Sequence, residues 1–321
     1  MAYSPQEQIA FLQPLVEPVQ PEDTMAEAGR KILLRELVRM LQHEQGSRSG
    51  DDIEDVHDMR VAIRRTRSAM RLLKPYLKGK AIRPYNRGLR HLGWVLGEVR
   101  DLDVMIENLK TYQTALDAEA AAAFQLVIDE LDQRRALARD ALNEYLDAKA
   151  YRRFIRDYSD FLTQPMREGR HAANGAVAPY QVRHVLPAMI YDRLAAVRAY
   201  DTVLPEANAG TLHALRIEFK RLRYTLSLFS DVLGSSAEEF VDTIKAIQDH
   251  LGHLNDSSVA RARLEGLADD PEASYADVLA GYLAHLEAHE AELKAGFAEV
   301  WQRFNSRKVQ QKLATAVLAL R

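Results

Sequence analysis

Residues 57–78 read HDMRVAIRRTRSAMRLLKPYLK, and this stretch carries two stripes of side chains at helical spacing. One stripe is apolar and recurs every three or four residues, as on the buried face of an α-helix: Met59, Ile63, Met70, Leu73 and Leu77. The other recurs at the same steps and is basic, and we call it the first basic stripe: His57, Arg60, Arg64, Arg67, Arg71, Lys74 and Lys78. The segment therefore predicts an amphipathic helix to about residue 78, with Pro75 bending its last turn. At about 1.5 Å per residue, its basic stripe would be roughly 30 Å long.

The first basic stripe is electrostatically unfavourable by itself. From Arg60 to Lys78 it holds five successive like-charge pairs at i,i+3 or i,i+4. Each such pair costs about 0.2–0.5 kcal/mol before screening. The acids of the predicted helix, Glu54, Asp55 and Asp58, lie in its first turn, where they suit the helix dipole but cannot neutralise the far end. The compensating charge must come from another helix or from a bound polyanion.

The positive charge of the chain is concentrated rather than general. The net charge of the 321 residues is only −3, yet residues 57–90 hold eleven Lys and Arg and one acid, or about +10. The remainder is then about −13, so the pattern indicates a local anion site. Cysteine is absent, which excludes disulfides and thiolate chemistry. We find no signal peptide and no run of membrane-spanning length, and we expect a cytoplasmic protein without a membrane partner.

Helical periodicity covers most of the chain and β-branched alternation is absent, so we predict an all-α fold. The expected organisation is an irregular N-terminal lead-in, a first helical bundle, a linker rich in Pro and Gly, a second helical bundle and a C-terminal helical tail: residues 1–22, 23–164, 165–179, 180–305 and 306–321.

A further helix is expected to begin near residue 81. It extends the basic surface with three cations at steps of four and three: Arg83, Arg87 and Arg90. Gly97 and Asp101, further along it, suggest a kink or a new helix start.

The two stripes are repeated in residues 213–233, which read HALRIEFKRLRYTLSLFSDVL. We call four of the repeated residues the second basic stripe, and they lie 156 positions after their counterparts: His213, Arg216, Lys220 and Arg223. Arg221 repeats Arg65 at the same offset. A second block repeats at an offset of 155, so that Lys245 matches Arg90. Two blocks in the same order predict an internal duplication, with two bundles related by an approximate twofold axis. The two stripes would then face each other across a groove or pore, although Ser227 stands where the first stripe has Arg71.

Four segments in this order resemble the CHAD domain, an all-helical family: VHDMRVAIRRTRSAMRLL, LRHLGWVLGEVRDLDV, LHALRIEFKRLRYTLSLF and IKAIQDHLGHLNDSSV. They span most of residues 24–305. The resemblance implies two helical bundles around a basic groove or pore, binding of inorganic polyphosphate, and association with polyphosphate granules and their proteins. Many relatives carry an N-terminal CYTH-type triphosphatase domain with an ExExK signature. Residues 1–50 hold no such signature, so we expect a stand-alone CHAD protein that is not an enzyme.

The resemblance also implies, position by position, which residues bind polyphosphate: His57, Arg60, Arg64, Arg67, Arg71, Arg90, His213, Arg216, Lys220, Arg223 and Lys245. The geometry of the stripe adds four more cations: Lys74, Lys78, Arg83 and Arg87. His57 and His213, if protonated, would donate to phosphate and tighten binding at mildly acidic pH.

Three other functions compete with polyphosphate binding. A binder of single-stranded nucleic acid would need aromatic stacking platforms, and none lies between His57 and Leu73. An enzyme acting on polyphosphate would need a carboxylate cluster, whereas Asp101 and Asp256 fit better as helix caps or as partners of neighbouring arginines. The third alternative is a scaffold that docks an acidic protein partner.

We predict no metal and no cofactor. Two histidine pairs have helical spacing, His285 with His289 and His250 with His253. Neither pair has the HExxH pattern or an evident third ligand, so we interpret them as surface histidines.

Overall fold

The computed structural model describes residues 4–77, 79–166, 180–268 and 275–320, and these ranges form helices joined by short turns, without a named strand. The all-α prediction is confirmed. The helices are α1 (Pro5–Leu12), α2 (Met25–Gln42), α3 (Glu44–Ser49), α4 (Ile53–Leu72), α5 (Gly79–Gln113), α6 (Ala118–Asp147), α7 (Lys149–Thr163), α8 (Val182–Arg198), α9 (Ala209–Leu228), α10 (Ser230–Leu233), α11 (Ser235–Ala268), α12 (Ala276–Phe304) and α13 (Arg307–Leu318). Three short 3₁₀ turns complete them: Gln13–Leu15, Ala199–Thr202 and Leu204–Glu206.

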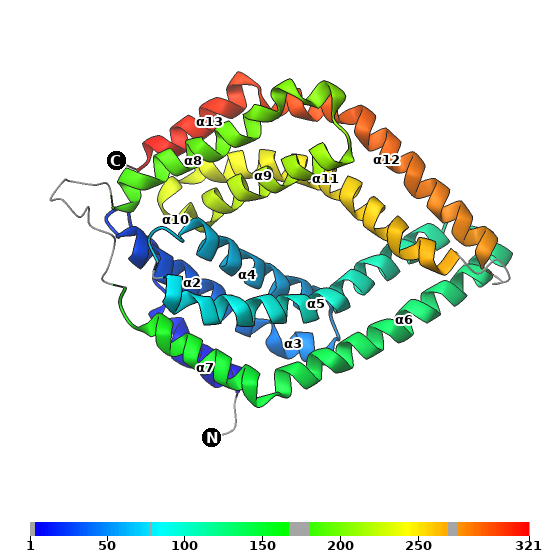
Figure 1. Ribbon diagram of the computed structural model, residues 1–321, viewed down its shortest axis with the longest axis horizontal. Helices are drawn as coiled ribbons and strands as arrows, with labels where there is room; N and C mark the ends of the chain where they lie inside the picture. The colour runs from blue at the N-terminus through cyan, green and yellow to red at the C-terminus, as the bar shows by residue number, and fades with distance from the viewer. Residues whose placement is uncertain (1–3, 78, 167–179, 269–274, 321) are drawn as a thin grey trace.

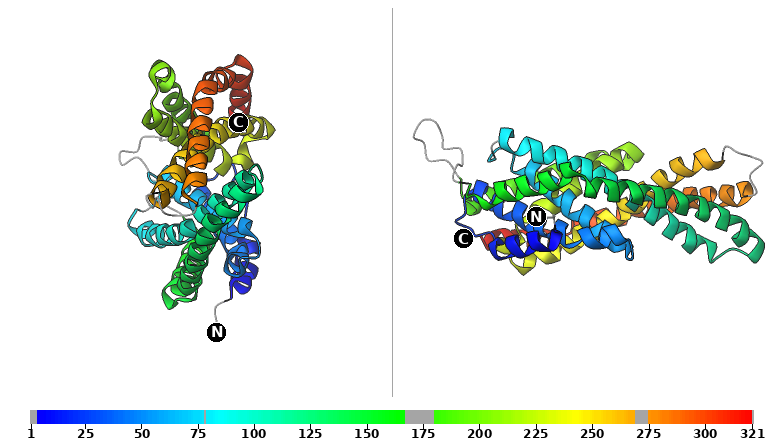
Figure 2. Two further views of the ribbon diagram at one scale, coloured as in Figure 1. Left: turned by 90° about the vertical axis from the view of Figure 1, so that its right-hand side faces the viewer. Right: turned by 90° about the horizontal axis from the view of Figure 1, so that it is seen from below.

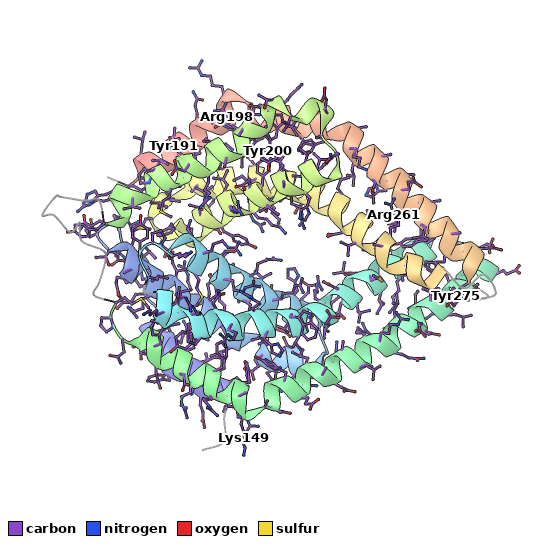
Figure 3. All side chains as sticks on the ribbon, in the orientation of Figure 1. Lys149, Tyr191, Arg198, Tyr200, Arg261 and Tyr275 are labelled. Atoms are coloured by element: carbon purple, nitrogen blue, oxygen red, sulfur yellow. The ribbon has the colours of Figure 1, made fainter. Side chains whose placement is uncertain are left out.

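The helices form a lozenge with two long arms (Figure 1). One arm is the pair α5 and α6, the other is the pair α11 and α12, and the arms meet where α6 contacts α12. At the opposite end, α4 and α9 pack against each other, α2 packs against α4, and α8 packs against α9. Seen from below, the molecule is long and narrow (Figure 2). Side chains such as Lys149 and Arg198 lie on its outer edge (Figure 3).

Helix α4 carries the first basic stripe, but it ends earlier than predicted. It begins with a cap, because the side chain of Asp52 accepts a hydrogen bond from the N–H of Glu54 at 2.8 Å. It ends at Leu72, not near residue 78. Pro75 disfavours the helical conformation in the residue before it and has no N–H to continue the ladder. Lys74 therefore lies exposed in a turn after the helix, and Lys78 lies outside the described residues.

The N-terminal lead-in is not irregular as predicted, because it contains α1. The side chain of Ser4 accepts a hydrogen bond from the N–H of Glu7, and Pro5 occupies the start of the helix. Proline favours the first turn of a helix, where its missing N–H has no intrahelical partner. Leu12 is completely buried against the core.

Helix α5 is continuous through Gly97 and Asp101, so no new helix starts at these residues. The structure gives a packing reason for the absence of a side chain at Gly97. A Cβ atom there would collide with Nη1 of Arg60, which crosses from α4. Gly97 therefore allows an arginine of the first basic stripe to lie against α5.

One hydrophobic core joins residues of both predicted bundles. It contains side chains of α2, α4, α5, α7, α8, α9, α11 and α13, including the completely buried Leu33, Met59 and Phe219. A smaller core lies where the arms meet, around Phe124 and Leu279. Because α4 and α9 belong to the same core, their polar faces are held in a defined mutual position.

Charged side chains of α2 attach to both α4 and the end of α9. The carboxylate of Glu36, which is completely buried, accepts from Nε of Arg65 on α4 at 2.9 Å. A second nitrogen of Arg65 donates to the carbonyl of Ser227 on α9 at 3.3 Å. Arg35 bonds Asp231 at 2.7 Å and the carbonyl of Leu228 at 3.0 Å. These contacts place α2 as a bridge between the two helices that carry the basic stripes.

Replacing Glu36 tests this bridge. Glu36→Gln leaves the guanidinium of Arg65 without its buried carboxylate, while Arg39, 2.8 Å away, also loses its charge partner. We expect the free energy of unfolding in urea to fall by about 3 kcal/mol. The matched control is Glu130→Gln, which removes an exposed i,i+4 pair with Arg134 and should cost less than about 1 kcal/mol. Equal losses in the two variants would contradict the bridge.

Candidate anion-binding site

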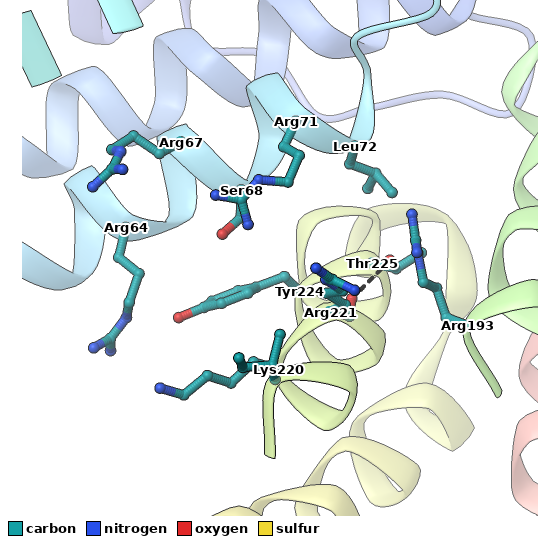
Figure 4. A pocket seen from close by; sticks show the side chains of 11 residues that line it. Arg64, Arg67, Ser68, Arg71, Leu72, Arg193, Lys220, Arg221, Tyr224 and Thr225 are labelled. Atoms are coloured by element: carbon teal, nitrogen blue, oxygen red, sulfur yellow. Dashed lines mark hydrogen bonds between the residues drawn. The ribbon is translucent and has the colours of Figure 1, made fainter. Parts of the chain in front are cut away.

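Helices α4 and α9 line one pocket of about 740 Å³. Six of its lining side chains are cations, and none of the described lining residues is a carboxylate (Figure 4). The cations come from three helices: Arg64, Arg67 and Arg71 from α4, Lys220 and Arg221 from α9, and Arg193 from α8. The remaining lining residues are Ser68, Leu72, Ile217, Tyr224 and Thr225. The pocket is therefore suited to an anion with several negative charges.

Four of the sequence-predicted binding residues line this pocket together: Arg64, Arg67, Arg71 and Lys220. Two of its cations were missed. Arg221 could have been found from its match to Arg65 in the repeat. Arg193 belongs to no basic stripe, so only the packing of α8 against α9 brings it to the pocket.

Several donors in and beside the pocket are buried without a hydrogen-bond partner in the described part of the chain. They include Nε of Arg64, Nε of Arg67 and the hydroxyl of Tyr224. Nε of Arg216, one helical turn before Lys220 on α9, is in the same situation. Buried polar groups are hydrogen-bonded in the great majority of proteins, and an unsatisfied donor costs about 1–3 kcal/mol. Phosphate oxygens would supply the acceptors that these donors lack.

The cations are close enough to disturb one another. Burial, followed by the charges of Arg216 and Arg64, lowers the pKa of Lys220 to about 8. Burial and then the charges of Arg90 and Arg71 lower the pKa of Arg67. A bound anion would remove this repulsion, so the site is electrostatically prepared for a ligand.

The other predicted residues do not line the pocket. Arg60 lies 3.5 Å from Asp101 of α5, which agrees with the interpretation of Asp101 as a partner of an arginine. The guanidinium of Arg223 lies over the ring of Tyr224, 5.6 Å from its centroid. The remaining members lie exposed on α5, α9 and α11: Arg83, Arg87, Arg90, His213 and Lys245.

His57 begins the first basic stripe and is half-buried. Burial, and then the nearby charge of Arg100, lower its pKa, with a further contribution from Arg64. The cationic form of His57 is therefore less favoured than that of an ordinary histidine. This shift argues against the expectation that His57 becomes charged at mildly acidic pH and tightens binding.

A second pocket, of about 360 Å³, lies where α5, α11 and α12 converge. His253, His285 and His289 line it, together with Tyr112 and Tyr282. No group of three or more His, Cys, Asp or Glu side chains in the described ranges could hold a metal ion. His250, the fourth histidine of the predicted pairs, bonds the carbonyl of Leu293 at 2.7 Å.

The fold and the pocket together define an all-helical protein with a cationic site between two of its helices. The model of the CHAD domain family matches residues 31–265, well over half of the chain, and the chain belongs to this family. The resemblance seen in the four sequence segments is thus confirmed.

The chain is similar to two uncharacterized proteins of Mycobacterium tuberculosis, from strains CDC 1551 and H37Rv. Each is 30% identical over 217 residues, which is 67% of this chain and 40% of the relative. The match therefore spans about two fifths of the length of these relatives.

Two solved structures share the fold. One is the CHAD domain of the plant Ricinus communis, with 21% identity, a TM-score of 0.66, and coverage of 95% of this chain and 96% of that one. The other is PptA from Streptomyces chartreusis, with 16% identity, a TM-score of 0.65, and coverage of 89% of this chain and 100% of that one. Within the described ranges, no helix is both long enough and apolar enough to cross a membrane.

The lowered pKa of Lys220 predicts that this residue destabilises the unliganded protein. At pH 7 the folded chain must hold a proton on a lysine whose pKa is about 8 instead of 10.5. We expect Lys220→Met to raise the free energy of unfolding by about 1 kcal/mol at pH 7, a value discounted for partial solvent exposure.

The pH dependence supplies the check. As the pH rises through about 8, the folded wild type loses this proton while the unfolded chain keeps it up to about 10.5, so wild-type stability rises. The difference in the free energy of unfolding between wild type and Lys220→Met, measured in urea, should become smaller between pH 7 and pH 9.5. Lys149→Met, at an exposed position on α7, is the control and should change little at either pH. A difference that stays constant over this pH range would contradict a lowered pKa of Lys220.

Proposed function

We propose that this chain binds inorganic polyphosphate in the pocket between α4 and α9. The observation that carries the proposal is one pocket lined by six cations and by no carboxylate among the described residues. The buried, unpaired donors of Arg64, Arg67 and Tyr224 lie in the same place. Polyphosphate binding is a general property of the CHAD domain family, to which the chain belongs.

The chemistry of polyphosphate fits this pocket better than that of other polyanions. Polyphosphate is a flexible chain with closely spaced negative charges and no bases, so its binder needs donors in rows on rigid supports. Arginine offers forked donors to phosphate oxygens, and lysine offers a compact charge. A single-stranded nucleic acid would require several stacking platforms, whereas Tyr224 is the one aromatic ring among the described residues that line the pocket. We therefore favour polyphosphate over nucleic acid and over an acidic protein partner.

We further propose that the two halves of the chain are copies that contribute one basic stripe each. Helices α4 and α9 have the same length of 20 residues, and each begins at a side-chain cap, Asp52 or Asn208. Long helices of 35 and 34 residues follow them: α5 comes after a short turn, and α11 comes after the four-residue helix α10. In this proposal a longer polyphosphate continues from the pocket along a basic groove past the other predicted residues: His57, Arg60, Lys74, Lys78, Arg83, Arg87, Arg90, His213, Arg216, Arg223 and Lys245.

The proposed role is binding rather than catalysis. A protein that holds polyphosphate without cleaving it can attach to, or organise, polyphosphate granules in the cytoplasm, together with granule-associated proteins. Because a row of phosphate contacts releases counterions, its affinity should fall steeply with salt concentration.

A double charge reversal tests the site. Arg64→Glu with Lys220→Glu places two carboxylates on opposite sides of the pocket, so repulsion should reduce affinity for long-chain polyphosphate at least about 100-fold. The measurement is a titration at physiological salt, repeated with an equal phosphate concentration of single-stranded DNA as competitor. Helicity should be retained, because both side chains lie off the buried face of their helices.

The matched control is Lys149→Glu with Arg198→Glu. It changes the net charge equally, but both side chains are exposed on the outer edge (Figure 3). Normal binding by the pocket variant would show that the pocket is not the site. Displacement of polyphosphate by DNA from the wild type would make the pocket a general polyanion surface.

Proton uptake gives a second, independent test. At pH 8 the free protein holds a proton on about half of its Lys220 side chains, because the pKa is about 8. A bound polyanion raises this pKa, so binding should take up about half a proton per site. Calorimetric titrations at pH 8 in two buffers of different ionisation enthalpy measure this number. The uptake should disappear in Lys220→Arg, and uptake that persists in this variant would assign the proton to another group.

A further inference from the structure

One end of the pocket is surrounded by cations from three helices instead of two. Arg71 of α4, Arg193 of α8 and Arg221 of α9 lie around this end, beside Leu72 (Figure 4). Arg64 and Lys220 lie at the other end (Figure 4). Arg193 is the one residue that α8 contributes to the lining. A polyphosphate lying between α4 and α9 would therefore meet cations on two sides along most of the pocket and on three sides at this end.

Arg193 has no structural partner that explains its position. It is half-buried, and no hydrogen bond or ion pair holds its guanidinium in the described part of the chain. Arg71, which is exposed, also has no hydrogen bond or ion pair in the described part of the chain. Arg221 pairs with Glu218 through one of its nitrogens, and the other guanidinium nitrogens remain available. A half-buried cation without a counter-charge is unfavourable unless a ligand compensates it.

The internal and terminal phosphates of a linear polyphosphate differ in their charge and in the number of oxygens that a binding site must contact. An internal phosphate has two non-bridging oxygens and one charge. A terminal phosphate has three non-bridging oxygens and up to about two charges near neutral pH, because its second pKa is about 6. Guanidinium groups donate in a planar fork and bind such oxygens in pairs. Three guanidiniums from three directions therefore match a terminal phosphate better than an internal one.

We propose that Arg71, Arg193 and Arg221 form a subsite for the terminal phosphate of a linear polyphosphate, with Arg193 as its specificity-determining residue. This inference rests on the proposed function of the pocket. The rest of the polyphosphate runs from this end of the pocket past Arg67 toward Arg64 and Lys220. The protein then holds polyphosphate by an end, and cyclic polyphosphates, which have no terminal phosphate, bind without this subsite.

The test compares linear hexaphosphate with cyclic hexametaphosphate, which have the same number of phosphorus atoms. Each is titrated into the wild type and into Arg193→Gln at one ionic strength and pH. We expect Arg193→Gln to lose about tenfold in affinity for the linear compound, the equivalent of one charge-assisted contact. Its affinity for the cyclic compound should change by less than about twofold. Using the ratio within each compound removes the unequal total charge of the two probes.

Arg198→Gln is the matched control, because it makes the same change on the same helix at an exposed position on the outer edge. It should leave both affinities unchanged. If Arg193→Gln loses stability, Arg193→Lys keeps the charge without the fork and should still lose affinity selectively for the linear compound. Circular dichroism and thermal unfolding establish that each variant is folded.

The outcomes separate this inference from the proposed function. Equal losses for the linear and cyclic compounds would make Arg193 an ordinary charge contact and would overturn end recognition, while polyphosphate binding stands. No loss for either compound would remove Arg193 from the site. If the wild type bound neither compound nor long-chain polyphosphate, the proposed function itself would fail.

Discussion

The packing of α4 against α9 is the constraint on which the rest of the structure depends. It brings two rows of cations together. Burial, and then the charges of Arg216 on the same helix and of Arg64 on α4, lower the pKa of Lys220, so repulsion between the rows opposes the contact in part. Apolar side chains on the opposite faces of the same helices, Met59 and Phe219 among them, are completely buried in one core. The bridge from α2, through Glu36 and Arg65, joins the two helices with charges that do not line the pocket. Burial and this bridge together offset the repulsion.

This arrangement links stability to binding. Cations that are crowded and incompletely hydrogen-bonded weaken the unliganded fold, and the same groups gain most from an anion that supplies both charge and acceptors. A ligand that binds only the folded state stabilises it by mass action. These properties favour the proposed binding role of the pocket, because a structural role alone would be served better by paired or apolar residues.

Several local features could be predicted from the sequence because they depend on nearest neighbours along the chain. The periodicity of three and four residues identified the helices and the basic face of α4, since side-chain direction in a helix repeats every 3.6 residues. The end of α4 was placed too late. Leu73 and Leu77 keep the apolar spacing of the helix and are buried, but they are buried from a turn that Pro75 imposes. The lead-in was misread because Pro5 starts a helix instead of breaking one.

The sequence by itself determined that the protein is all-helical, which residues form the two basic stripes, and which family the four segments resemble. Only the tertiary structure decided that Arg64, Arg67 and Arg71 share a pocket with Lys220, that Arg193 joins them from α8, and that Lys245 does not. The physical reason is that periodicity specifies the face of a helix on which a residue lies. It does not specify which helices pack together, in what register, or at what angle, because those depend on contacts between residues far apart in the chain.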